Sequence, residues 1–137
     1  MTDATPTLAL ALDLVILDCP DALELARFYS DILGWPIEDG ADSHFATLSP
    51  PGGGVSPDRP DGRTTLAFQQ IADWAAPTWP GGAHPQQLHL DFSVDDIDAT
   101  EPFLLAAGAT RHDHQPSRDG GFRVFVDPVG HPFCLIR

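Results

Sequence analysis

Residues 12–29 read LDLVILDCPDALELARFY, and residues 87–104 read QLHLDFSVDDIDATEPFL. Aligned with each other, the two stretches place Asp21 on Asp96, and an apolar alternation precedes this residue in both copies. Alternation with a period of two is typical of a strand, and an Asp before an amphipathic run is typical of a helix start. The chain therefore contains one strand–helix pattern twice.

The two copies differ at their centres. Leu14 aligns with His89, and Ile16 aligns with Asp91. The first copy is apolar at positions where the second carries groups that can bind a metal or titrate. This asymmetry points to the second copy as the carrier of any chemistry.

Composition limits the class of protein. With 137 residues, of which 42% are hydrophobic, the chain fits one compact domain or two small repeats that share a core. Its net charge of −13 would repel phosphates and anionic lipids, so we expect neither nucleic acid nor a membrane as a partner. The charge would favour a cationic ligand, although it also serves plain solubility.

We expect a cytoplasmic protein. No apolar run reaches the roughly 18 residues that a membrane span requires. Residues 1–12 lack the basic region of a signal peptide. Cys19 and Cys134 are too few for a disulfide framework, so both thiols should be reduced.

The first unit, residues 10–71, is expected to fold as βαβββ. Its first strand covers residues 12–18. Asp21 caps the helix that follows, Glu24 has the spacing of a capping box, and Gly34 ends the helix. Three further strands are expected at residues 35–38, 43–48 and 64–71.

A proline- and glycine-rich linker, residues 72–85, leads to the second unit, residues 86–137. Its helix, residues 96–108, contains Pro102, which predicts a late start or a kink. The strands are expected at residues 87–94, 109–111, 122–126 and 132–136.

The first strand of the second unit has two distinct faces. Leu88, Leu90 and Phe92 lie on one face and should pack on the helix. His89 and Asp91 lie on the other face, which should line the inside of a curved sheet. An apolar concave wall with a few polar groups is typical of a small-molecule pocket.

Three segments resemble a known family: LDCPDALELARFYSDILGW, APTWPGGAHPQQLHLDFSVDD and FVDPVGHPFCLIR. They are similar to glyoxalase-like proteins of the vicinal oxygen chelate superfamily, which includes bleomycin-resistance proteins and extradiol dioxygenases. The resemblance covers about residues 10–137. It implies an α+β fold in which two βαβββ units form a curved, mixed eight-stranded sheet with helices outside, a cavity, and often a homodimer.

The resemblance also implies where a metal would be held. The corresponding positions carry Leu14, then Ala67 or Gln69, then His89, then Cys134, and only His89 is of the usual ligand type. We therefore expect no metal. The alternative is one divalent ion on His89, Gln69 and Cys134.

A second set of ligands is His89, Asp91 and Cys134. This set would be strained, because α-carbons two residues apart on a strand are about 6.5–7 Å apart. Without a metal, His89 should be hydrogen-bonded to Asp91, or act with it as a general base. His89 and Asp91 are thus the candidate catalytic residues. His131 is expected to have a turn or packing role, whereas His112 and His114 should be exposed.

Two tryptophans, Trp74 and Trp79, flank the linker and could stack a planar or cationic ligand. The residues predicted to contact a ligand share a position near the concave face or the linker: Leu14, Ile16, Gln69, Trp74, Trp79, His89, Asp91, Phe125 and Cys134.

The leading hypothesis is a metal-independent protein that binds a small organic molecule, an antibiotic or a metabolite, in an aromatic cavity of a homodimer. The alternative is a glyoxalase-like lyase, isomerase or dioxygenase that uses His89 with Asp91, Cys134 or Gln69, with or without metal. A third hypothesis is a structural or regulatory dimer without a small ligand.

Overall fold

The computed structural model describes residues 10–137. Residues 1–9, which hold most of the stretch assessed as a signal peptide, lie outside this range. The elements follow one another as β1 (Leu14–Cys19), α1 (Ala22–Leu33), β2 (Phe45–Thr47), β3 (Thr65–Gln70), β4 (Leu90–Ser93), α2 (Ile97–Ala107), β5 (Thr110–Arg111), β6 (Phe122–Val126) and β7 (Pro132–Ile136). Within the described range, no helix has the length and apolar character that crossing a bilayer requires.

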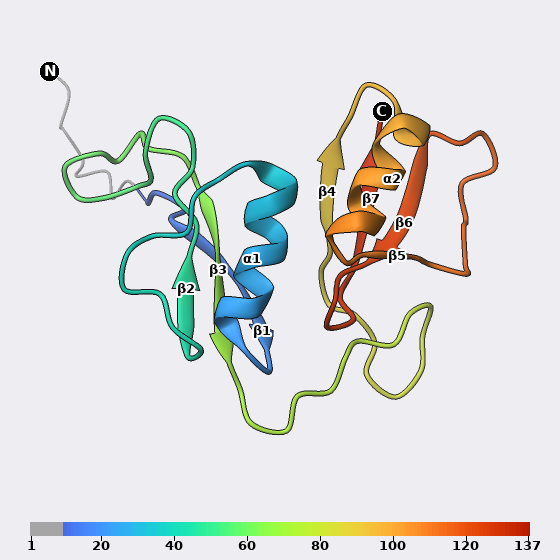
Figure 1. Ribbon diagram of the computed structural model, residues 1–137, viewed down its shortest axis with the longest axis horizontal. Helices are drawn as coiled ribbons and strands as arrows, with labels where there is room; N and C mark the ends of the chain where they lie inside the picture. Colours follow the sequence, from blue (N-terminus) through green and yellow to red (C-terminus); the bar gives the residue numbers. More distant parts are fainter. Residues whose placement is uncertain (1–9) are drawn as a thin grey trace, which may run out of the picture.

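The strands form two mixed sheets, each covered by a helix (Figure 1). The first sheet has the order β1–β3–β2, with β1 parallel and β2 antiparallel to β3. The second has the order β4–β7–β6–β5, in which only β4 and β7 are parallel. The predicted α+β architecture of two strand–helix units is confirmed.

The sequence predicts eight strands, and the structure has seven among the described residues. The segment 35–38 is reduced to an isolated bridge between Ile37 and Leu48. Pro36 has no N–H, and Gly40 turns the chain two residues after the segment with a φ of 87°, so the pairing cannot extend. The two sheets are also separate, because β1 and β4 share no ladder.

The first helix begins and ends where the sequence predicts. The Asp21 side chain accepts a hydrogen bond from the backbone N–H of Glu24 at 3.1 Å. Gly34 adopts a φ of 71° and donates its N–H to the carbonyl of Ser30. Such a left-handed position favours glycine because it has no Cβ.

The second helix does not start late. It begins at Ile97, directly after Asp96, whose side chain accepts from the N–H of Ala99 at 3.0 Å. The Asp96 carbonyl accepts from both the N–H and the hydroxyl of Thr100. This first turn is bonded before Pro102 is reached, so the proline lies inside the helix.

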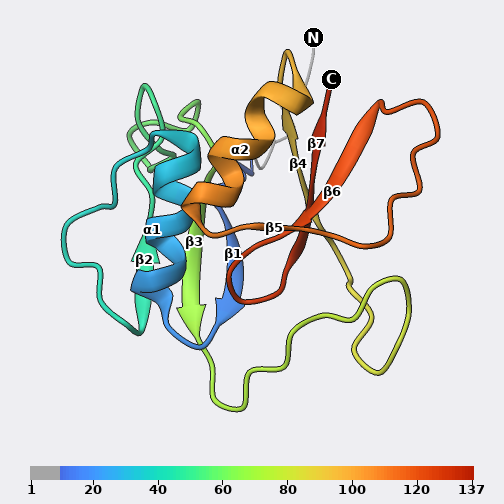
Figure 2. The ribbon, with the colours of Figure 1, turned by 45° about the vertical axis from the view of Figure 1, so that its right-hand side comes forward.

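Both units contribute to one core. The helices α1 and α2 lie side by side (Figure 2). Tyr29 of α1 stacks on Phe68 of β3 at 5.4 Å between ring centroids, and its ring edge meets Phe133 of β7 at 6.4 Å. The aromatic side chains therefore join the first sheet to the second.

The strand faces agree with the predicted alternation, with one exception. Leu90 and Phe92 pack against the core. Leu88 is 60% exposed instead, because β4 begins only at Leu90 and the regular alternation does not reach back to Leu88.

Candidate functional site

The main cavity lies between the first strand and the segment that leads into β4. It has a volume of about 440 Å³. Ile16 on β1 and Leu88 before β4 supply apolar walls, while Trp74 of the linker supplies an aromatic one. His89 and His131 supply polar groups. Apolar walls with a few polar groups are suited to a small organic molecule.

A smaller cavity of about 210 Å³ adjoins the same histidine. Its walls include Trp79, His89, Phe122 and Cys134. The Trp79 ring meets the imidazole rings of His112 and His114, edge to face, at 5.0 and 5.2 Å between centroids. His89 therefore lies on the wall of both cavities.

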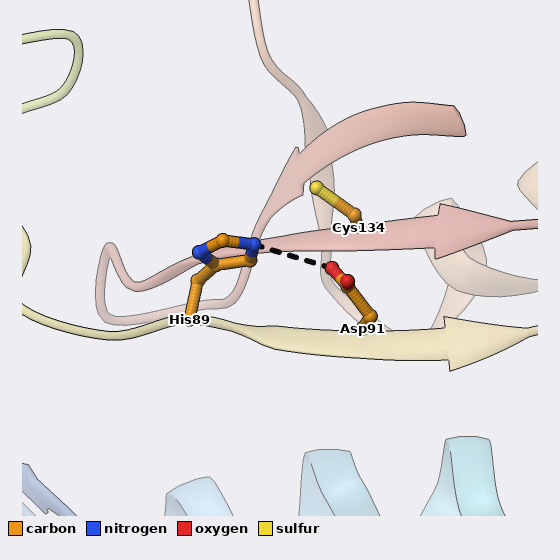
Figure 3. A group of neighbouring side chains, drawn as sticks. All are labelled: His89, Asp91 and Cys134. Atoms are coloured by element: carbon orange, nitrogen blue, oxygen red, sulfur yellow. Dashed lines mark ion pairs between the residues drawn. The ribbon is translucent and has the colours of Figure 1, made fainter. Parts of the chain in front are cut away.

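Three potential ligand atoms gather on one side of the second sheet. Figure 3 shows His89 and Asp91, from the segment of β4, beside Cys134 on β7. The three atoms all lie within 4.8 Å of one another. Nε2 of His89 is 3.3 Å from Oδ1 of Asp91, and the two side chains are 43% and 45% exposed. Asp91 is paired with Cys134 in the strand register, which accounts for their proximity.

The thiol of this cluster is protonated at neutral pH. Burial, followed by the neighbouring carboxylate of Asp91, which opposes a thiolate, raises the pKa of Cys134 from 9.0 to about 11. Cys134 is 8% exposed. As it stands, this cysteine is a weak nucleophile.

The structure brings together part of the predicted ligand-contacting set. Ile16, Trp74 and His89 line the main cavity. Trp79 and Cys134 line the smaller one with His89, and Asp91 contacts His89.

Three of the predicted ligand contacts lie elsewhere. Phe125 is fully buried and stacks on Phe133 at 5.8 Å, so it belongs to the core; its register opposite Phe133 turns it toward the helix side. Gln69 is exposed on β3 and Leu14 is half-buried on β1. Neither lines a cavity that contains His89.

A family model described as a glyoxalase-like domain matches residues 14–136. The chain belongs to the glyoxalase-like family. None of the curated protein sequences matches it.

Solved structures support the glyoxalase-like fold. A glyoxalase/bleomycin resistance protein/dioxygenase family enzyme from Burkholderia phytofirmans PsJN is 17% identical, with a TM-score of 0.63 over 92% of this chain and 97% of that one. A possible glyoxalase from Bacillus cereus is 13% identical, with a TM-score of 0.61 over 94% and 100%. A glyoxalase family protein from Enterococcus faecalis is 21% identical, with a TM-score of 0.58 over 90% and 94%. At these identities the likeness shows the fold alone.

The three potential ligand atoms of this site fit a metal ion only in part. His89, Asp91 and Cys134 supply three donor atoms, the number that many catalytic zinc sites use. All three come from the second unit. At the positions where the resemblance implies ligands from the first unit, Leu14 and Ala67 are hydrocarbon, and Gln69, the alternative to Ala67, lines neither cavity that His89 lines. An ion would also have to displace the proton of Cys134.

Sequence reasoning missed four residues around the main cavity of this glyoxalase-like protein. Tyr29, Gln86 and His131 line it, and Asp127 lies behind His131. The segment DPVGH, residues 127–131, was recognisable as a turn. No local signal placed Tyr29 beside it, because the Tyr29–Asp127 contact spans 98 residues of sequence.

Proposed function

We propose that this protein binds a small organic molecule, an antibiotic or a metabolite, in its main cavity and needs no metal to do so. The observation that carries the proposal is the cavity of about 440 Å³, which combines Trp74 with apolar side chains and three histidines, His84, His89 and His131. A volume of this size accommodates a compact aromatic ligand. The indole of Trp74 is held in place by its N–H, which donates to the carbonyl of Val129 at 3.0 Å.

The proposal that ligand binding needs no metal rests on the side chains of the first unit. Leu14 offers only hydrocarbon, and Ala67 on the neighbouring strand is fully buried and equally unable to coordinate. Gln69, the alternative to Ala67, has a carbonyl oxygen but lines neither cavity that His89 lines. A metal held by the second unit alone would depend on a half-exposed imidazole, a half-exposed carboxylate and a protonated thiol. We expect such a set to lose its metal during purification.

Metal analysis of tag-free protein tests this part of the proposal. We expect well below one equivalent of zinc, manganese, nickel or iron per chain after dialysis. The contrary result is one retained equivalent that disappears in His89→Ala but not in His44→Ala. His44 is an exposed histidine paired with Asp42, away from the cavities, so it serves as the matched control.

Ligand screening tests the other part. Binding to the main cavity should shift the NMR signal of the Trp74 indole N–H, assigned by its loss in Trp74→Phe. If no compound of a diverse aromatic set moves that signal, the binding function is refuted.

A second candidate is a glyoxalase-like lyase, isomerase or dioxygenase. The three donor atoms within 4.8 Å favour it, since a bound divalent ion would supply a Lewis acid there. Turnover that requires added metal and is lost in both His89→Ala and Asp91→Ala would establish this enzyme in place of the binding protein.

We also propose a homodimer in the cytoplasm. The exposed apolar side chains of Leu12, Ile16 and Phe45 on the first unit support a protein partner. The two free cysteines, Cys19 and Cys134, support a reducing compartment. Analytical ultracentrifugation at micromolar concentration tests the dimer, and a single monomeric species would refute it.

A further inference from the structure

The wall of the main cavity includes His131, whose ring orientation is fixed by a hydrogen bond to a buried carboxylate. His131 ends the turn that leads into β7 and is 13% exposed at its side chain. Its Nδ1 lies 2.7 Å from Oδ2 of Asp127, a carboxylate with no exposed side-chain surface. The ring of Trp74 lies 4.8 Å from the imidazole ring and limits its rotation.

The bonds around Asp127 determine which imidazole nitrogen carries the proton. Oδ1 of Asp127 accepts three backbone N–H groups, those of Val129, Gly130 and His131, each at 3.0 Å. Oδ2 accepts the phenol O–H of Tyr29 at 2.7 Å. Because the two oxygens of Asp127 already accept four donors, this side chain serves as an acceptor, and Nδ1 of His131 donates to it.

The other nitrogen of His131 is therefore an acceptor in the neutral ring. Nε2 has no hydrogen-bond partner among residues 10–137, and His131 is part of the cavity wall. An Asp that fixes Nδ1–H leaves the Nε2 lone pair free for a ligand.

A second acceptor lies in the same wall. Oε1 of Gln86 is buried and has no hydrogen-bond partner in the described part of the chain. Gln86 lines both the main cavity and the smaller one. An amide oxygen can only accept, and leaving it unpaired costs about 1–3 kcal/mol. Because this oxygen is buried, a donor on a ligand removes that cost only when the Gln86 side chain turns its amide into the cavity.

We propose that Nε2 of His131 and Oε1 of Gln86 form an acceptor pair that selects a planar ligand with N–H donors, an aromatic amide, amine or amidine, over ligands that only accept. The inference deepens the proposed function and rests on it. Asp18, also in the wall, and the net charge of −13 disfavour carboxylates and phosphates in the same cavity. Trp74 supplies the flat surface for the ring.

Three probes of similar shape test the pair. Benzamide is neutral and donates, benzamidine is cationic and donates, and acetophenone is neutral and only accepts. We expect both donors to bind the wild-type protein about tenfold more tightly than acetophenone, the effect of one well-made hydrogen bond. Each titration follows the Trp74 indole N–H signal.

Substitutions show which side chains cause the preference for ligands that donate. Gln86→Met keeps the length of the side chain and removes the acceptor, and should lower benzamide affinity about tenfold while leaving acetophenone unchanged. Gln86→Glu keeps an acceptor and should retain the preference for donors. His131→Asn keeps a side-chain N–H for Asp127 but places no acceptor at the position of Nε2, so the preference should fall. His44→Asn is the control, because His44 is exposed on the first unit and lines neither cavity.

The outcomes separate the two levels of the proposal. If all three probes bind equally and Gln86→Met changes nothing, the acceptor pair is refuted while the cavity keeps its binding function. If benzamidine alone binds tightly, charge rather than the acceptor pair selects the ligand, and the inference is again refuted. If no probe moves the Trp74 signal at millimolar concentration, both the inference and the proposed function fail.

Discussion

The phenol of Tyr29 donates a 2.7 Å hydrogen bond to Oδ2 of Asp127, and this buried contact joins the helix of the first unit to the turn before the last strand of the second. Tyr29 is fully buried and Asp127 is 4% exposed. The bond thus connects the two halves of the chain inside the core.

Tyr29→Phe should lower the free energy of unfolding by about 1–3 kcal/mol, because the buried carboxylate loses one of its donors. Urea unfolding measures the change. In an Asp127→Asn background the same substitution should cost clearly less, since the charged acceptor is already gone. Equal costs in both backgrounds would show that the bond contributes nothing of its own.

The same tyrosine should make stability depend on alkaline pH. Burial, followed by the charge of Asp127, raises the pKa of Tyr29 well above 10.0. The unfolded chain then loses this proton first, so the contribution to stability is complete below about pH 10 and declines as the pH rises toward the folded-state pKa.

Tyr29 is the single tyrosine of the chain, which makes this effect separable. The difference in stability between wild type and Tyr29→Phe should shrink by up to about 1.4 kcal/mol per pH unit above pH 10. The cysteines titrate in both proteins and cancel. A difference that stays constant up to pH 11.5 would contradict the burial argument.

Cys134 should react slowly in the native protein. Its pKa of about 11, raised from 9.0 by burial and by Asp91, lowers the thiolate fraction at pH 8 about a hundredfold. In a Cys19→Ala background, iodoacetamide labelling should be at least that much slower than in denaturant. Asp91→Asn should accelerate it only modestly, because burial is the larger cause. Native labelling at the rate of a free thiol would place Cys134 in a different environment.

Arg123 should stabilise the second unit mainly through its better-buried partner. Its guanidinium contacts Glu101 at 3.0 Å and Asp98 at 2.8 Å; the side chain of Glu101 is 20% exposed and that of Asp98 is 85% exposed. Exposed ion pairs contribute about 0–1 kcal/mol. We expect Glu101→Gln to destabilise more than Asp98→Asn in thermal unfolding; the reverse order would contradict this account.

Gly130→Ala should disturb the cavity wall. The turn gives Gly130 a φ of +106°, and a Cβ there would lie 2.5 Å from Cβ of Ala76 in the linker. Gly120→Ala is the matched control, since it also has a positive φ, of +74°, but open space around its Cβ. Both should lose about 1–2 kcal/mol from backbone strain, and Gly130→Ala should lose more and shift the Trp74 indole signal. Equal losses would show that the linker yields freely at Ala76.

The sequence predicted what local chemistry determines. The caps at Asp21, Asp96 and Gly34 are short-range signals, and all three are observed. The proximity of His89, Asp91 and Cys134 followed from alternation and from the repeat. His89 itself lies outside the regular strand, because β4 begins at Leu90.

What the sequence could not predict depends on register and on distant contacts. Phe125 was expected at a ligand, and only its pairing opposite Phe133 reveals that it faces the core. The turn at residues 127–131 was visible, but the role of His131 depends on Tyr29, which is brought there by tertiary packing. Of the two expectations from Pro102, a late helix start or a kink, the late start was wrong, because Asp96 caps the helix at Ile97.

The absence of a ladder between β1 and β4 has a consequence for folding as well as for recognition. The main cavity opens along this seam, with Ile16 on one side and His89 on the other. A ligand bound there would contact both units and add a third connection between them, beside the packing of α1 on α2 and the Tyr29–Asp127 hydrogen bond. Occupancy should therefore raise the unfolding temperature of the whole chain.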